Sequence, residues 1–115
     1  SQARSNMKRA MLDIKRSDLN IERDKLQLKQ DVYTAYYSAS GAFQTFVARE
    51  KAMVTAQRSF DLASRRFELG VMQTIEWLTN QNNLTRAKID KALAQYEYIF
   101  RMKVLEFYKG QGLRL

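Results

Sequence analysis

Apolar residues recur through the first half of the chain at alternating spacings of four and three residues. Eleven of the twelve positions in this series are apolar: Leu28, Val32, Ala35, Ala39, Ala42, Phe46, Arg49, Met53, Ala56, Phe60, Ala63 and Phe67. A mean spacing of 3.5 residues is the repeat of a left-handed coiled coil. It predicts one helix over about residues 3–69, which would be ~100 Å long. A compact globule of this chain length is only ~30 Å across, so an ordinary small globular domain is excluded.

Two further series lie on the same helix. One is apolar: Leu12, Leu19, Leu26, Tyr33, Tyr36, Phe43, Val47 and Val54. The other is polar and largely basic: Arg9, Arg16, Arg23, Gln30, Tyr37, Gln44, Lys51, Arg58 and Arg65. Two apolar seams indicate neighbours on two sides of the helix, as in a large bundle or a helical barrel. The basic series is either a solvated face or a lining or partner surface.

Gly70 is the only strong break in the central part of the chain. The sequence has no Pro and four Gly, so few turns are expected. A glycine accepts a positive φ without a Cβ clash, which allows a tight reversal at residues 69–73. An antiparallel hairpin then places residue i opposite roughly residue 143 − i. This pairing predicts an aromatic cluster of Tyr33, Tyr36, Tyr37 and Phe107. Gly41 would lie near Met102, either as a site of close backbone approach or bending or as a surface glycine.

A shorter second helix is expected over residues 74–109. Thr74 is a candidate N-cap, and Glu76 falls in the first turn, where the helix dipole favours a carboxylate. This helix also has two apolar lines. One comprises Leu78, Thr85, Ile89, Ala92, Tyr96 and Ile99, and the other Trp77, Leu84, Ala87, Ala94, Tyr98, Leu105 and Tyr108. The glycines at 110 and 112 are expected to end the helix near residues 108–109 and leave residues 110–115 extended or disordered. Residues 1–32 would then have no partner within the hairpin, which indicates a fragment of a larger assembly.

The composition restricts the possible functions. There is no Cys and no His, which excludes disulfides, thiolate nucleophiles, Ser-His-Asp triads and the usual zinc sites. No enzyme activity, cofactor or metal is therefore expected. The net charge of +8 is compatible with a nucleic acid, an anionic membrane surface or an acidic partner. Acidic residues interleave with the bases, which argues against RNA or membrane binding: Asp13, Asp18, Glu22 and Asp24. No apolar run is long enough for a transmembrane helix. A stand-alone coiled-coil interaction or scaffold module is the alternative.

The second half of the chain carries a family pattern. Its elements are Phe67, Gly70, the Trp77-Leu78 pair, Gln81, Leu84, Ala87 and the run AQYEY at 94–98. Upstream, DVYTAYY occupies residues 31–37. In this order and spacing the chain resembles the C-terminal repeat of the TolC-like outer-membrane efflux proteins. The resemblance implies that residues 1–115 are one periplasmic helical hairpin of an outer-membrane protein in a Gram-negative bacterium. The parent protein would be a homotrimer whose hairpins form an α-barrel tunnel for efflux or type I secretion.

The resemblance also implies a function for the hairpin tip at residues 69–73. The tip would lie at the periplasmic mouth of the tunnel and contact a periplasmic adaptor (membrane fusion) protein that works with an inner-membrane pump. The implied contacts are Phe67, Leu69, Gly70, Val71 and Met72, with Glu76 as an acidic residue just inside the mouth. Thr79 stands where some members repeat the acid, so a second acidic ring is not expected. Alternatively, Leu69 and Met72 merely cap the hairpin core. No nucleic-acid partner is implied.

Overall fold

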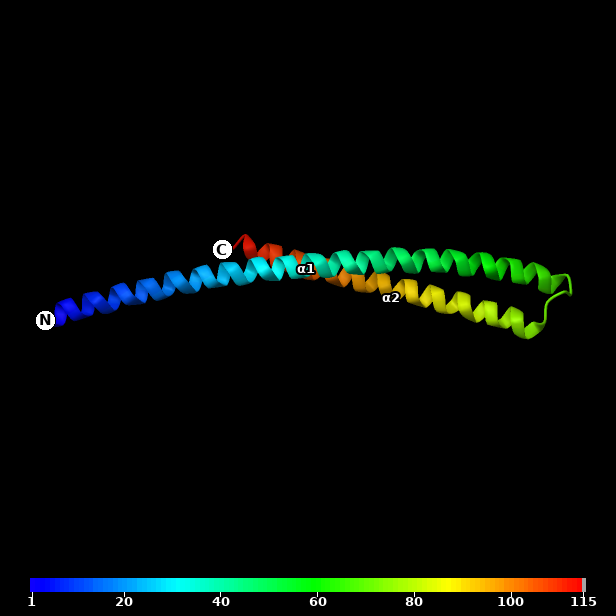
Figure 1. The fold of residues 1–115 in the computed structure, drawn as a ribbon, viewed down its shortest axis with the longest axis horizontal. Coiled ribbons are helices and arrows are strands. Elements are labelled where there is room, and N and C mark those ends of the chain that lie inside the picture. The colour runs from blue at the N-terminus through cyan, green and yellow to red at the C-terminus, as the bar shows by residue number, and fades with distance from the viewer. Residues whose placement is uncertain (115) are drawn as a thin grey trace.

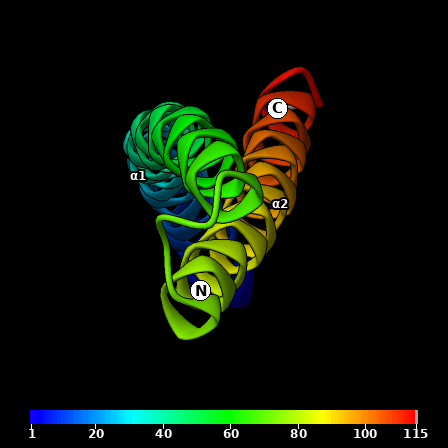
Figure 2. The same cartoon turned by 90° about the vertical axis from the view of Figure 1, so that its right-hand side faces the viewer.

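The computed structural model describes residues 1–114 and consists of two α-helices joined by a short loop (Figure 1). Helix α1 spans Gln2–Glu68 and helix α2 spans Thr74–Gly112. They run antiparallel, and the molecule measures 102 × 20 × 14 Å. The end-on view shows the two helices side by side with the loop at the near end (Figure 2). The prediction of an all-α hairpin with unequal helices is confirmed.

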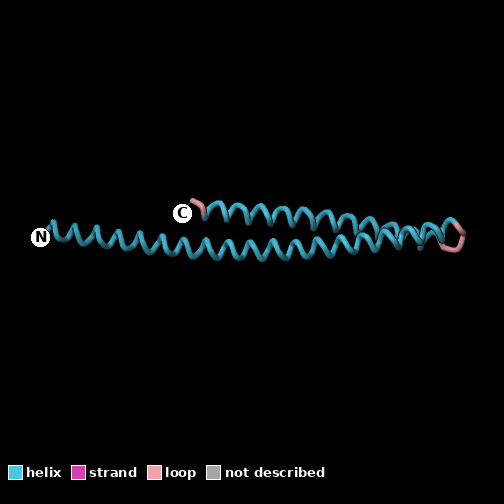
Figure 3. Tube along the Cα trace, turned by 90° about the horizontal axis from the view of Figure 1, so that it is seen from above, coloured by secondary structure: helices cyan, strands magenta, loops and turns pink. Residues whose placement is uncertain are grey.

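The N-terminal part of α1 extends well past the end of α2 (Figures 1 and 3). The cause is a difference in length, because α1 has 67 residues and α2 has 39. Ser1 caps α1, and its Oγ accepts a hydrogen bond from the Arg4 amide at 3.4 Å. No proline interrupts either helix, and α1 continues through Gly41 until it ends just before Gly70. Gly41 is exposed, and a Cβ there would meet no atom within 4 Å. It is a surface glycine in this hairpin.

The two helices pack along one line of each. In the twelve-position series of α1, every member except Arg49 is buried or half-buried. On α2 the packed line is the one that starts at Trp77, and all seven of its members are buried or half-buried. The most deeply buried side chains are Ala35, Ala39, Ala63, Leu84 and Leu105. Alanines on α1 thus face larger side chains on α2, which lets the helices approach closely and fills the space between them. These two packed lines are called the inner seam below.

Arg49 is the polar exception in the inner seam. Its Nη1 lies 4.0 Å from Asp90 Oδ2, and Lys91 Nζ lies 3.9 Å from Glu50 Oε2. All four side chains keep substantial contact with solvent. Such exposed pairs contribute at most about 1 kcal/mol each. The middle of the hairpin is therefore held mainly by the apolar residues on either side of this polar layer.

The remaining apolar lines are left uncovered. On α1 the second series is exposed apart from half-buried Val47. On α2 the line that starts at Leu78 is exposed throughout its length, and Leu93, Phe100 and Phe107 are exposed beside it. These exposed lines are called the outer seams. Contiguous exposed apolar surface on this scale marks an interaction face.

The predicted aromatic cluster is wrong. Its members are exposed: Tyr33, Tyr36, Tyr37 and Phe107. Phe107 lies two residues after the buried Leu105, a rotation of about 200° around the helix, so it points away from α1. The observed pairing is also shifted from the predicted one, since Glu50 faces Lys91 and Ser64 bonds to Trp77. Instead, the Tyr98 ring lies 5.3 Å from Phe43 and 6.4 Å from Phe46.

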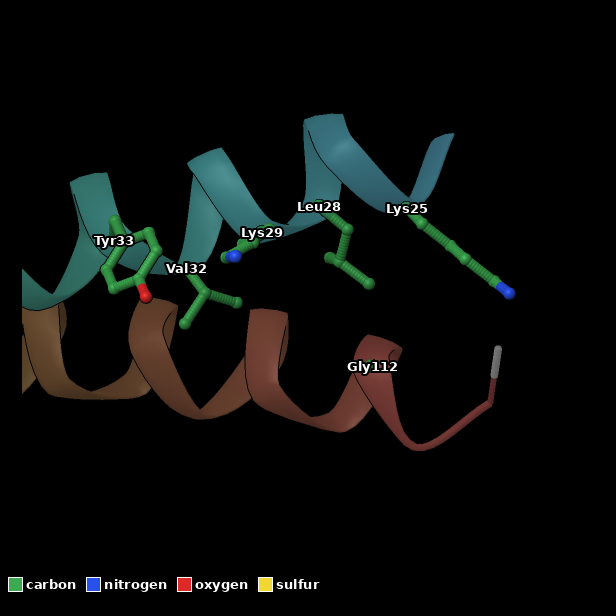
Figure 4. A pocket seen from close by; sticks show the side chains of 6 residues that line it. All are labelled: Lys25, Leu28, Lys29, Val32, Tyr33 and Gly112. Carbon is green, nitrogen blue, oxygen red and sulfur yellow. The ribbon is translucent and has the colours of Figure 1, made fainter. Parts of the chain in front are cut away.

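Helix α2 continues beyond its predicted end. It includes residues 110–112, so the expectation of an extended segment is wrong there, and residue 115 lies outside the described residues. A glycine in a helix costs about 1 kcal/mol relative to alanine. That cost does not end the helix here, and α2 stays beside α1 through this turn, since a Cβ added at Gly112 would lie 3.9 Å from Leu28 Cδ2. Figure 4 shows Leu28 and Val32 directed from α1 toward the last turns of α2.

The inner seam predicts that replacing two different leucines of α2 by alanine will destabilise the hairpin to different extents. Leu105→Ala should lower the free energy of unfolding by about 2–3 kcal/mol, because it leaves a cavity beside the buried alanines of α1. Leu93→Ala is the matched control, since Leu93 is 62% exposed, and should change stability by less than about 0.5 kcal/mol. Urea unfolding followed by circular dichroism at low protein concentration measures both. Equal losses would contradict the observed assignment of the inner seam.

Candidate functional site at the hairpin tip

The turn at the tip is built around Gly70. Its φ is 74°, the one positive φ among the described residues. The Val71 amide donates to the Arg66 carbonyl at 2.9 Å, and the Gly70 amide donates to the Phe67 carbonyl at 3.0 Å. These two bonds form a Schellman motif, which satisfies the last carbonyls of α1 and reverses the chain. The prediction that Gly70 makes the tight reversal is confirmed.

The loop presents apolar side chains to solvent. Leu69 is 77% exposed and Val71 is 72% exposed, whereas Met72 is half-buried. Leu69 is therefore too exposed to cap the hairpin core, while Met72 is partly shielded from solvent. Ile75, in the first turn of α2, adds another exposed apolar side chain. The tip thus carries a small apolar surface on a backbone that is fixed by hydrogen bonds.

Helix α2 begins at Thr74, one residue earlier than an N-cap at Thr74 would place its first helical residue. Gln73 has extended dihedrals and is the N-cap, with its carbonyl accepting from the Glu76 and Trp77 amides at 3.1 and 3.2 Å. Thr74 is the first helical residue, so its predicted role as N-cap is wrong. The chain becomes helical immediately after Gln73, whose side chain makes no capping hydrogen bond in the described structure. The start of α2 therefore lacks a stabilisation that is typically worth ~1 kcal/mol.

Glu76 lies in the first turn of α2, as predicted, and is exposed. The amide end of the helix dipole favours a carboxylate there. Glu76 lines a shallow depression with Ile75, Thr79 and Asn80. Thr79 Oγ1 donates to the Ile75 carbonyl at 2.8 Å, and Asn80 Nδ2 donates to the Glu76 carbonyl at 2.9 Å. The surface beside the tip therefore combines one free carboxylate with neutral polar groups that bond back to their own helix.

Phe67 lies within the hairpin and not on its outer tip. Its half-buried ring stacks on the indole of Trp77, with centroids 4.9 Å apart and planes 14° apart. The Phe60 ring lies 5.9 Å from the same indole, and Trp77 Nε1 donates to Ser64 Oγ at 3.0 Å. These four residues, Phe60, Ser64, Phe67 and Trp77, are called the tip clamp. Sequence reasoning placed Phe60, Phe67 and Trp77 on seams but missed that they meet. The sequence feature that could have predicted this contact is the pair of phenylalanines seven residues apart, which lies opposite the chain's single tryptophan.

Comparison with known proteins now defines the family. The family of the outer membrane efflux proteins matches residues 1–110. The chain belongs to this family. No curated protein and no solved structure matches it. Membership implies a role in an outer-membrane efflux channel, and the resemblance inferred from the sequence is confirmed. Members of the outer membrane efflux protein family are in general not enzymes. Neither helix in the described part of the chain is long and apolar enough to cross a membrane.

The left-handed backbone at Gly70 predicts graded effects of substitution. A Cβ at this position would meet no atom within 4 Å, so the cost arises from the backbone alone. Gly70→Val should lower the free energy of unfolding by about 1–2 kcal/mol, since a β-branched residue disfavours positive φ. Gly70→Asn should lose less, because asparagine visits this region more readily. Chemical denaturation of the three proteins tests this order, and an equal loss for both variants would contradict it.

Proposed function

We propose that the chain is a periplasmic stave of an outer-membrane efflux tunnel and that its tip contacts a periplasmic adaptor protein. The observation that carries the adaptor contact is the pair of exposed side chains, Leu69 and Val71, at the closed end of a 102 Å hairpin. Membership in the family of outer membrane efflux proteins supports the role in an efflux channel. The adaptor would connect the channel to an inner-membrane pump, which selects the exported compound.

The outer seams support the role as a stave. Each helix has one neighbour within the chain and an uncovered apolar line of its own. On α2 the inner and outer lines lie on roughly opposite sides, since Leu105 is buried and Phe107, about 200° around the helix, is exposed. Further helices packed on both sides of the hairpin, in one continuous layer, would cover these apolar lines. A homotrimeric parent whose hairpins close into a barrel provides such neighbours.

The tip is suited to binding by its small size and fixed backbone. Burying an exposed leucine or valine contributes about 1.5–3 kcal/mol before the costs of ordering are subtracted. The Schellman bonds at Gly70 already order the backbone that carries Leu69 and Val71. The loop therefore loses little conformational entropy when it binds. Most of the free energy gained by burying the apolar side chains can then contribute to affinity.

Glu76 is proposed as the carboxylate of the tunnel mouth. It is exposed one turn below the loop, and the start of α2 stabilises its charge. Thr79, one turn further along α2, bonds to its own helix and adds no charge. A symmetric trimer would place three copies of Glu76 around the mouth, and their summed negative potential would favour cations over anions there.

The adaptor contact predicts a selective loss of binding when the tip is charged. In the parent channel, Leu69→Asp combined with Val71→Asp should weaken adaptor binding at least about 10-fold, because two apolar contacts become buried charges. Leu62→Asp is the matched control, since Leu62 is 51% exposed on the same line of α1, two turns before Leu69. Co-purification with the host bacterium's adaptor protein and an export assay measure the effect.

Two results would contradict the adaptor contact. One is an equal loss of binding for the tip variant and the Leu62→Asp control. The other is normal adaptor binding and export by a Gly70→Val parent channel, because that substitution should distort the turn that presents the contacts. Normal assembly of the parent trimer, checked by gel filtration, must accompany each variant.

A further inference from the structure

The tip surface is formed by two halves that are held in different ways. Leu69 and Val71 are tied to α1 by the Schellman bonds. Ile75 and Glu76 belong to α2, whose start has an N-cap without a side-chain hydrogen bond. An uncapped first turn is prone to fray. Whatever anchors this first turn to α1 therefore decides whether the two halves keep one relative position.

The tip clamp is the contact that joins the two halves. Trp77 is the fourth residue of α2, and its indole bonds to Ser64 on α1 at 3.0 Å. The same ring lies between Phe67, at 4.9 Å, and Phe60, at 5.9 Å. Aromatic pairs at these separations prefer defined relative orientations, and the hydrogen bond fixes the rotation of the indole within its plane. Stacking and hydrogen bonding together determine where α2 starts.

We infer that Trp77 is the positioning residue of the hairpin tip. Through Phe60, Ser64 and Phe67 it holds the first turn of α2, with Ile75 and Glu76, against the end of α1. The tip then presents one surface to its partner instead of an ensemble of surfaces. A preorganised surface binds more tightly because less freedom is lost on association. The consequence for docking rests on the proposed adaptor contact, whereas the geometric role of Trp77 does not.

Distance measurement between spin labels tests the geometric role directly. The sequence has no cysteine, so Lys51→Cys on α1 and Ile75→Cys on α2 can be labelled selectively at two exposed positions. The unmodified clamp should give one narrow distance distribution. Trp77→Ala should broaden it about twofold or more, because the first turn of α2 loses its anchor.

Tyr98→Ala is the matched control. Tyr98 also packs against two phenylalanines of α1, at 5.3 and 6.4 Å, but it lies 21 positions further along α2. It should reduce thermal stability while the distribution at Ile75 stays narrow. Ser64→Ala removes only the hydrogen-bond acceptor and should broaden the distribution less than Trp77→Ala does. Ser64→Thr keeps a hydroxyl and should restore the narrow distribution.

Adaptor binding provides the second readout. In the parent channel, Trp77→Ala should weaken binding of the host bacterium's adaptor protein about 10-fold, and Tyr98→Ala should leave it unchanged. An unchanged distribution with Trp77→Ala, or equal broadening with Tyr98→Ala, would overturn the positioning role. A broadened distribution with unchanged adaptor binding would overturn its relevance to docking. If the unmodified channel binds no adaptor, the proposed tip contact fails, and the spin-label distances alone decide the role of Trp77.

Discussion

The structure depends on the fit between small side chains on α1 and larger ones on α2. Ala35, Ala39 and Ala63 are among the most buried residues, and Leu84 and Leu105 pack from the other helix. Because only two helices form the molecule, these residues contribute the deepest apolar burial in the part of the chain that is described. An isolated two-helix layer cannot bury more than one face of each helix. Every other apolar line must therefore remain at the surface unless another chain or segment covers it.

This constraint connects the shape of the hairpin to its place in an efflux channel. Covering the outer seams would extend the layer on both sides, and the overhang of α1 offers further apolar surface beyond the end of α2. The closed end differs from the rest, since a glycine turn and the tip clamp hold it by contacts within the chain. The long sides are thus suited to lateral packing, and the tip is suited to end-on contact.

Much of this fold was predictable from the sequence, because a 3.5-residue repeat over forty residues determines both the helix and its packed face. The repeat also revealed the outer seams, but the sequence did not show which line of α2 would face α1. The tight turn at Gly70 and the place of Glu76 in the first turn of α2 were predicted correctly from local backbone and dipole preferences. The aromatic cluster failed because a shift of two residues in pairing moves a side chain about 200° around a helix. The end of α2 was misplaced because a glycine costs a helix only about 1 kcal/mol, and α2 stays helical through Gly110 and Gly112.

The central claim is that the outer seams are contact surfaces that need partners. The most direct test is thermal melting of the 115-residue chain over a wide range of protein concentrations, combined with sedimentation to determine its mass. The account predicts association and a melting temperature that rises with concentration, because oligomer formation stabilises the folded chain by mass action. A monomer with a high melting temperature that is independent of concentration would contradict it.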